Sequence, residues 1–164
     1  MSRQRLMAVV SLLAVLVGGL LAGPAQAHEN YHRVNLSGSI YTLDDDLWPN
    51  PDDSGTHIFS GSVRVGPDVF SQSFATSDCV GGEVYSTLTV IVEDQAGGWI
   101  KARARGRVFE YENCPNGDLD GDSGEKTVWV PLGSERTITF RVHNGEPGDY
   151  GYTDYRLTVQ NRPA

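Results

Sequence analysis

Residues 113–125 have the types and spacing of a cation-binding loop. They read Asn-Cys-Pro-Asn-Gly-Asp-Leu-Asp-Gly-Asp-Ser-Gly-Glu, so aspartates stand at alternate positions. Calcium takes roughly six to eight oxygen ligands from carboxylates, amide oxygens and backbone carbonyls, and alternate side chains of such a loop can turn inward around one ion. The pattern predicts calcium as the cofactor. The predicted ligands are Asn116, Asp118, Asp120, Asp122 and Glu125.

Part of this stretch matches the calcium loop of the EF-hand. Asn116, Asp118, Asp120 and Gly121 fit the first half of the pattern D-x-[DN]-x-[DN]-G. The second half does not fit, because Thr127 stands where a bidentate acid is expected, and no flanking helices are predicted. The alternative interpretation is a solvated turn, since Asp and Gly favour turns for backbone reasons alone.

The N-terminal residues predict export. Residues 1–27 begin with Arg3 and Arg5, continue with an apolar run, and end in Ala25-Gln26-Ala27, which is the pattern of a secretory signal peptide and its cleavage site. We therefore expect a secreted, extracellular protein whose single domain spans residues 28–164. No later segment is apolar enough to predict a membrane span.

The mature chain is strongly acidic. Without Arg3 and Arg5, 11 basic side chains remain against 21 acidic ones, a net charge of −10. This charge argues against nucleic acid as a partner, because nucleic acids are bound through basic surfaces. It is compatible with solubility or with cation binding.

The two cysteines, Cys79 and Cys114, predict one disulfide. Exported proteins meet an oxidising compartment, and neither cysteine has the spacing of a zinc or redox motif. The alternative is a pair of unpaired thiols.

The rest of the chain has the period of two that is typical of half-buried strands. About eight such segments, separated by turns rich in Gly, Pro and Asp, predict an all-β antiparallel β-sandwich, with a closed β-barrel as the alternative. The predicted strands are residues 34–43, 57–65, 69–76, 84–92, 99–111, 127–130, 136–142 and 155–160.

Long connections follow the first, third, fifth and seventh predicted strands. Because antiparallel strands alternate in direction, these long acidic loops are expected at one end of the sandwich. Cys79 and Cys114 fall in two of them, as a disulfide requires. The arrangement is similar in outline to C2-type sandwiches, which bind calcium among acidic loops at one end.

A basic row is predicted on the strand at residues 99–111. Its cations stand at alternate positions and therefore share one face of the strand, with small or apolar residues on the other. We interpret the row as a solvated face paired with acids on adjacent strands, with docking of an acidic partner as the alternative. The row consists of Lys101, Arg103, Arg105 and Arg107.

Three aromatic residues of the long loops are candidate ligand-binding residues: Trp48, Tyr150 and Tyr152. Exposed rings can stack on a sugar or a peptide, so the expected partner is an extracellular carbohydrate or protein. The alternative is that these rings pack over the open end of the sandwich.

Cleavage after Ala27 would leave His28 with a free α-amino group. An amine and an imidazole from one terminal histidine can chelate copper together with a second histidine, for which His32, His57 and His143 are available. This terminus resembles the histidine brace of secreted copper oxygenases, which are also β-sandwiches. The resemblance implies a copper-binding oxidative enzyme.

The sequence thus favours a secreted binding module, with calcium as a candidate stabiliser of its acidic end, over an enzyme. No G-x-S-x-G, H-E-x-x-H or cysteine nucleophile is present. The two alternatives are the copper enzyme built on His28 and a metal-free protein-interaction or inhibitor domain.

Overall fold

The structure is a computed structural model, and it describes residues 31–45, 53–145 and 151–164. These residues form nine strands and one three-residue 3-10 helix, η1 (Ala96–Gly98). No helix in the described ranges has the length and apolarity to span a bilayer. The strands are β1 (His32–Asp44), β2 (Asp53–Val65), β3 (Ser71–Val80), β4 (Val84–Gln95), β5 (Trp99–Asn113), β6 (Asn116–Asp122), β7 (Lys126–Pro131), β8 (Glu135–His143) and β9 (Tyr152–Pro163).

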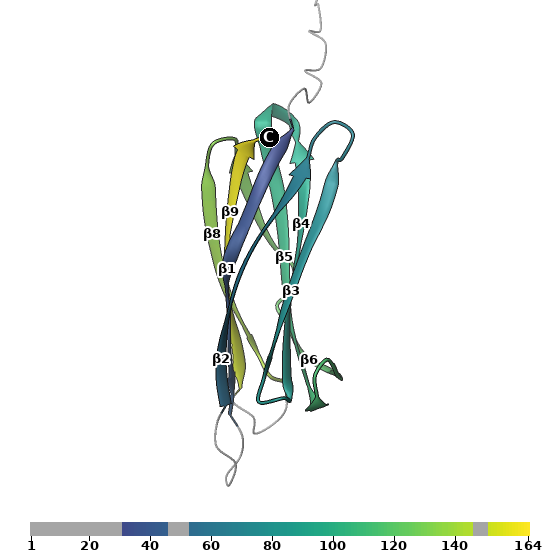
Figure 1. The fold of residues 1–164 in the computed structure, drawn as a ribbon, viewed down its shortest axis with the longest axis vertical. Coiled ribbons are helices and arrows are strands. Elements are labelled where there is room, and N and C mark those ends of the chain that lie inside the picture. The colour runs from purple at the N-terminus through teal and green to yellow at the C-terminus, as the bar shows by residue number, and fades with distance from the viewer. Residues whose placement is uncertain (1–30, 46–52, 146–150) are drawn as a thin grey trace, which may run out of the picture.

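The strands form two antiparallel sheets that pack face to face (Figure 1). The four-stranded sheet has the order β2-β1-β9-β8. The five-stranded sheet has the order β3-β4-β5-β6, and β7 pairs with β5 beside the half that β6 leaves free. The predicted β-sandwich is therefore confirmed, and the β-barrel alternative is wrong, because the two sheets do not close on each other.

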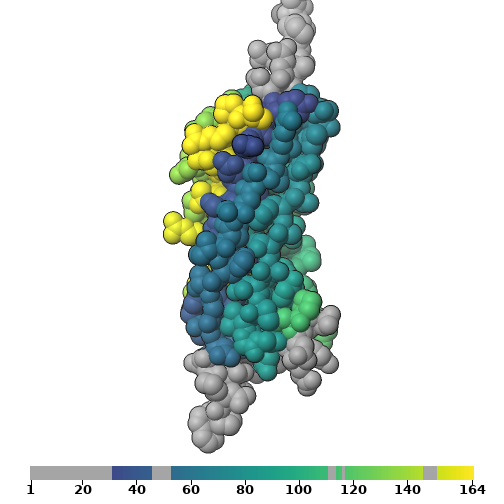
Figure 2. All heavy atoms as spheres, in the orientation of Figure 1, coloured from purple at the N-terminus to yellow at the C-terminus, as the bar shows by residue number. Residues whose placement is uncertain are grey.

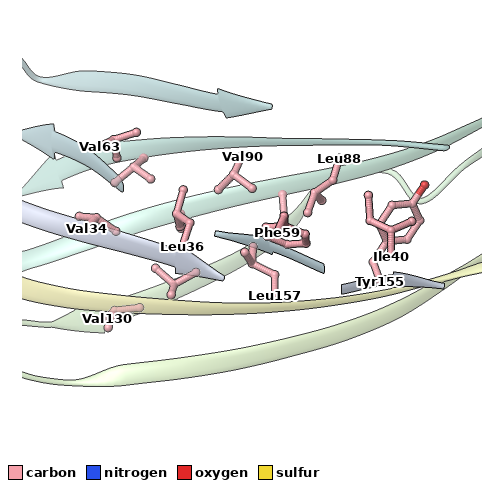
Figure 3. Close-up of a cluster of buried hydrophobic side chains, with 14 of the residues drawn as sticks. Val34, Leu36, Ile40, Phe59, Val63, Leu88, Val90, Val130, Tyr155 and Leu157 are labelled. Atoms are coloured by element: carbon pink, nitrogen blue, oxygen red, sulfur yellow. The ribbon is translucent and has the colours of Figure 1, made fainter. Parts of the chain in front are cut away.

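Alternation along the strands builds the core between the sheets (Figure 3). In β1, Val34, Leu36 and Ile40 are fully buried, whereas Arg33 and Ser37 on the opposite face are exposed. The same period of two in β4, β5 and β9 places apolar side chains inward from both sheets. Removal of these side chains from water is the main stabilising contribution to such a fold.

Small residues on β5 make room for a large one on β9. A Cβ atom added to Gly106 would lie 2.6 Å from the ring of Tyr155 and 2.8 Å from the ring of Phe140. These two rings stack with their centroids 4.9 Å apart. The buried Tyr155 hydroxyl donates a hydrogen bond of 2.9 Å to the carbonyl of Arg107, which satisfies its polar end.

All eight predicted strands exist, although their ends differ by several residues. The ninth, β6, lies within residues 113–125, where the sequence predicts a loop, so that prediction is wrong. Asp and Gly are unfavourable in strands, and the period of two is obscured there by a register shift between Val108 and Phe109 of the partner strand β5. Pairing with β5 overrides the local preference.

The expected arrangement of the connections is confirmed. The connections after β1, β3, β5 and β8 each join two antiparallel strands, and all four leave from one end of the sandwich, the lower end in Figure 1. We call this end the loop end and the other the terminal end, because β1 starts and β9 finishes there (Figures 1 and 2). Two of the four connections are shorter than predicted, since β3 extends to Val80 and only Cys114 and Pro115 separate β5 from β6.

Buried polar groups connect the two sheets near both ends. Toward the loop end, the hydroxyls of Thr42, Ser86 and Thr153 bond to one another over 2.8 to 3.2 Å. At the terminal end, His32 Nδ1 lies 2.8 Å from Asn161 Oδ1, and His32 Nε2 lies 3.5 Å from the Asp94 carboxylate. Because the three hydroxyls and the His32–Asn161 pair are hydrogen-bonded, these groups can be buried without the full cost of desolvation.

Candidate functional site

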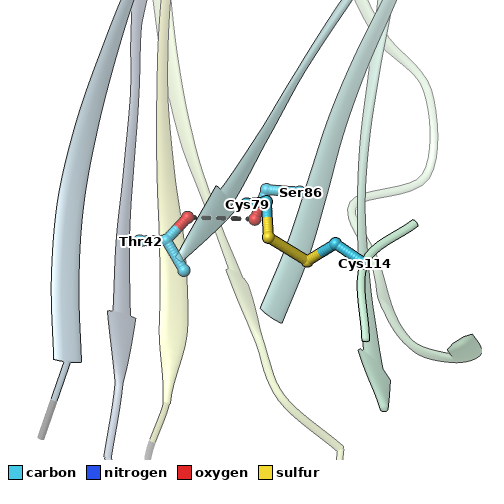
Figure 4. Close-up of a disulfide and its surroundings, with 4 residues drawn as sticks. All are labelled: Thr42, Cys79, Ser86 and Cys114. Carbon is cyan, nitrogen blue, oxygen red and sulfur yellow. Dashed lines mark hydrogen bonds between the residues drawn. A yellow bond between two sulfur atoms is a disulfide. The ribbon is translucent and has the colours of Figure 1, made fainter. Parts of the chain in front are cut away.

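The predicted disulfide between Cys79 and Cys114 is present (Figure 4). The two Cα atoms are 6.2 Å apart, and the bridge ties the end of β3 to the turn between β5 and β6. It lies beside the hydrogen bond between Thr42 and Ser86, close to the loop end. Such a bridge is typical of proteins outside the cytoplasm.

Two of the five predicted calcium ligands pair with arginines instead of facing one another. Arg105 Nε donates to Asp122 Oδ1 over 2.8 Å, and Arg107 Nε donates to Asp122 Oδ2 over 3.2 Å. Arg103 Nη1 donates to Glu125 Oε2 over 2.9 Å. Asp122 and Glu125 therefore lie along the outer face of the five-stranded sheet, away from the loop end.

These contacts shift the acidity of Asp122. The hydrogen bond from Arg105 is the largest cause, and it lowers the pKa of the Asp122 carboxyl to about 2 against an ordinary value of 3.8. Desolvation acts in the opposite direction, and the backbone N–H of Gly124 adds a further stabilising hydrogen bond of 2.8 Å. The carboxylate is thus held ionised by cations of the protein itself.

The remaining predicted ligands, Asn116, Asp118 and Asp120, are on β6. Two other acids come together at the loop end: Asp44 and Asp53 are register partners, and a Cβ atom added to Gly81 would meet both carboxylates within 3.3 Å. Within the described ranges, no group of three or more His, Cys, Asp or Glu side chains is placed to hold a metal. Calcium binding at this end stays a prediction.

The basic row on β5 is an ion-pair network, as expected. Arg103 bridges Glu93 of β4, at 2.7 Å, and Glu125. Lys101 lies 3.8 Å from Glu93, and Arg105 and Arg107 share Asp122. The interpretation as a solvated face paired with acids on neighbouring strands is confirmed.

Of the predicted aromatic ligand residues, Tyr152 is described, and Trp48 and Tyr150 lie outside the described residues. Tyr152 opens β9 on the outer face of the four-stranded sheet. The Arg141 guanidinium lies 3.6 Å from the centroid of its ring, and the rings of Tyr41 and His143 lie 6.1 and 6.3 Å away. Tyr152 is therefore part of an aromatic and basic cluster toward the loop end.

An open groove of about 420 Å³ adjoins this cluster, and we call it the Tyr41 groove. Asp154 in it accepts two hydrogen bonds from Arg141, of 2.7 and 2.6 Å, and the contact keeps the pKa of Arg141 above its ordinary value. The neighbouring Arg156 is exposed and has no ion-pair partner among the described residues. The groove is lined by Ser39, Tyr41, Thr139, Phe140, Arg141, Asp154, Tyr155 and Arg156.

The candidate copper ligand His28 lies outside the described residues, and its possible partners are far apart. His32 is buried at the terminal end against Asn161, and His143 is exposed at the loop end. His57 bonds through Nε2 to Thr76 Oγ1 over 3.0 Å, across the neighbouring edges of the two sheets. The copper site stays a prediction.

Sequence reasoning missed the residues that line the Tyr41 groove. They come from β1, β8 and β9, which are distant in the sequence and adjacent in the sheet. The available signal was the alternation itself, which places Tyr41, Arg141 and Asp154 on outward positions. To infer that these positions are neighbours, the order of the strands in the sheet must be known, and a single sequence does not specify that order.

No protein-family profile and no curated protein sequence matches this chain. Among solved structures, it is similar to the secretin InvG (residues 176 to the end) of the Salmonella SPI-1 type III secretion injectisome in the open gate state, with a TM-score of 0.36 and 9% sequence identity. The alignment covers 82% of this chain and 61% of the secretin chain.

Proposed function

We propose that this protein is an exported binding module that holds an oligosaccharide in the Tyr41 groove. The observation that carries the proposal is the composition of the groove, which combines an aromatic ring, hydroxyls, a carboxylate and guanidinium groups on three adjacent strands. A sugar presents apolar C–H faces together with hydroxyl groups, and a site of this composition can contact both.

The scaffold favours binding because it keeps the groove rigid. Tyr41, Arg141 and Asp154 are all on paired strands, and Asp154 fixes the Arg141 side chain through two hydrogen bonds. Side chains that are already held in place lose little conformational entropy when a ligand binds.

Arg156 favours a ligand that carries a carboxylate. A guanidinium group donates two parallel hydrogen bonds to a carboxylate, and Arg156 has no described acid competing for it. We therefore expect oligosaccharides containing uronic acid to bind more tightly than neutral ones.

Export is the second part of the proposal. It rests on the signal-peptide pattern of residues 1–27 and is supported by the disulfide between Cys79 and Cys114, because disulfides persist in oxidising compartments.

Calorimetric titration with oligogalacturonate and with cellohexaose tests the site. We expect oligogalacturonate to bind the wild type, and Tyr41→Ala and Arg156→Gln each to weaken binding by about tenfold or more, the effect of losing one charge-assisted hydrogen bond or one stacked ring.

Tyr85→Ala is the matched control. Tyr85 is paired with the ring of Phe109 on the outer face of the other sheet, so its loss leaves the Tyr41 groove intact. If Tyr85→Ala weakens binding as much as Tyr41→Ala does, or if neither sugar binds at millimolar concentration, the Tyr41 groove is not a carbohydrate site.

A further inference from the structure

Three arginines of the four-stranded sheet stand in one row across three neighbouring strands. Arg33 of β1 is the register partner of both Arg64 of β2 and Arg162 of β9. All three side chains are exposed. Residues in register on adjacent strands point to the same face about 4.8 Å apart, so the three guanidinium groups leave the sheet side by side. We call these residues the arginine row.

The charges of the arginine row are not neutralised within the part of the chain that the structure describes. No described acid lies within ion-pair distance of Arg33, Arg64 or Arg162. In contrast, each arginine of β5 pairs with an acid of the protein. Like charges directly opposite each other on a sheet are destabilising. The chain has a net charge of −8, so three unpaired arginines side by side are not expected from its composition alone.

The surroundings of the arginine row provide further hydrogen-bonding groups. A groove of about 430 Å³ is lined by Arg33, Arg64, Ser62, Val63 and Ala164. Its lining residues are at the terminal end, where the start of β1 pairs with the end of β2 and the end of β9. Ser62 thus lines the same groove as two of the three arginines.

One side chain of the row is held in place by an aromatic ring. The Arg64 guanidinium lies 3.8 Å from the centroid of the Tyr31 ring. The Tyr31 hydroxyl donates a hydrogen bond to Asp68, and this bond raises the pKa of Tyr31. The Arg64 donors that point away from the ring stay available to a ligand.

We propose that the arginine row binds a ligand carrying two or more adjacent phosphate groups. A guanidinium group matches the geometry of a phosphate with two parallel hydrogen bonds, and three in a row match a chain of phosphates better than a single monovalent anion. The site is separate from the Tyr41 groove, because Arg162 lies six residues beyond Arg156 along β9, about 20 Å away.

Titration of the full chain with sodium tripolyphosphate at constant ionic strength tests the proposal. We expect Arg33→Gln to weaken binding by about tenfold or more, because Arg33 is the central member of the row. Arg136→Gln is the matched control, since it removes the same charge from an exposed position on β8 at the same end. Equal affinities of the two variants would overturn the proposal.

Thermal unfolding separates binding from a purely structural role. In the wild type, tripolyphosphate at ten times its dissociation constant should raise Tm by about 3–5 °C. Without the anion, Arg33→Gln should melt above the wild type by about 1–3 °C, because repulsion in the row is relieved. If Arg33→Gln melts below the wild type and tripolyphosphate has no effect on either protein, the row is a structural element and the proposal is wrong.

A vesicle-binding experiment distinguishes phosphate groups of a soluble ligand from those of a membrane surface. Co-sedimentation with vesicles containing phosphatidylglycerol, compared with neutral phosphatidylcholine vesicles, reports binding to isolated phosphates at a membrane surface. Tripolyphosphate binding that is lost in Arg33→Gln, without vesicle binding, supports a soluble oligophosphate as the ligand. Vesicle binding without affinity for tripolyphosphate would overturn the proposal.

Discussion

At the scale of the residue, Gly106 decides how the two sheets meet. The absence of a side chain at this position allows the rings of Tyr155 and Phe140 to lie against β5. Burial raises the pKa of Tyr155, and its hydroxyl stays a hydrogen-bond donor to the Arg107 carbonyl. The sequence places small or apolar residues on the inner face of β5, and the packing of β9 over β5 determines which side chain fills the space beside them.

Substitution of Gly106 by alanine is therefore expected to destabilise the protein. The added Cβ atom would lie within 2.6 Å of the Tyr155 ring, and overpacking of this kind costs about 1–3 kcal/mol. The free energy of unfolding in urea measures the loss.

The double variant Gly106→Ala with Phe140→Leu provides the control. Because leucine is smaller than the phenylalanine it replaces, it frees space beside Gly106 and should recover part of the stability that Gly106→Ala loses, beyond the sum of the single effects. If the changes in the free energy of unfolding of the two single variants simply add in the double variant, the clash is relieved by residues other than Phe140.

At the scale of the element, β6 is a strand that is stabilised by its partner β5 rather than by its own strand propensity. Its aspartates have low strand propensity, and its pairing with β5 supplies both backbone hydrogen bonds and cations for Asp122. The alternate spacing of the aspartates that predicts calcium ligands is also the spacing of a strand. The register shift between Leu119 and Gly121 interrupts the alternation, so Asp118 is the partner of Glu110 and Asp122 the partner of Arg107.

The contacts of Asp122 predict a stability that depends on pH. Its folded pKa of about 2 lies below the ordinary 3.8, so the stabilisation is present in full above the ordinary pKa and is lost as the pH falls toward 2. Because Arg105 and Arg107 are 48% and 41% exposed, solvent screens the pairs, and we expect a contribution of about 1 kcal/mol.

Comparison of the wild type with Asp122→Asn in urea near neutral pH and in strong acid, below the folded pKa, measures this contribution. The difference in the free energy of unfolding between the wild type and Asp122→Asn should be large at neutral pH and small in acid. Asp118→Asn, on the same strand and outside the described ion pairs, should show no such change with pH. An equal response of the two variants would assign the effect to net charge alone.

At the scale of the whole molecule, the sequence predicted the architecture better than the sites. The period of two in β1, β4 and β5 and the turns rich in Gly, Pro and Asp indicate a sandwich, and strand alternation predicts that Cys79 and Cys114 share one end. The arginine row and the Tyr41 groove could not be predicted, because each unites strands that are adjacent only after β9 pairs with β1. Strand order is determined by long-range packing, to which local patterns contribute little.

The disulfide is expected to stabilise the whole chain through its unfolded state. Cys79 and Cys114 are separated by 35 residues, and closing a loop of that size contributes about 3–4 kcal/mol in the chain-entropy description. The double variant Cys79→Ser, Cys114→Ser should therefore unfold at a lower urea concentration than the wild type. Reduced wild type serves as a second measurement, and unfolding of the double variant at the wild-type midpoint would contradict the expectation.

The position of β6 at the border of the five-stranded sheet has one more consequence. A strand at a sheet border exposes unpaired N–H and carbonyl groups that can recruit a strand from another molecule, which is the first step of aggregation. Here the border strand carries Asp118, Asp120 and Asp122, is short, and breaks off before β7 begins. A second copy that approached this border with its own β6 would bring negative charges close together. It would also meet a border at which the backbone hydrogen bonding is interrupted between β6 and β7. The aspartates of β6 are therefore expected to disfavour edge-to-edge pairing of two copies at this border.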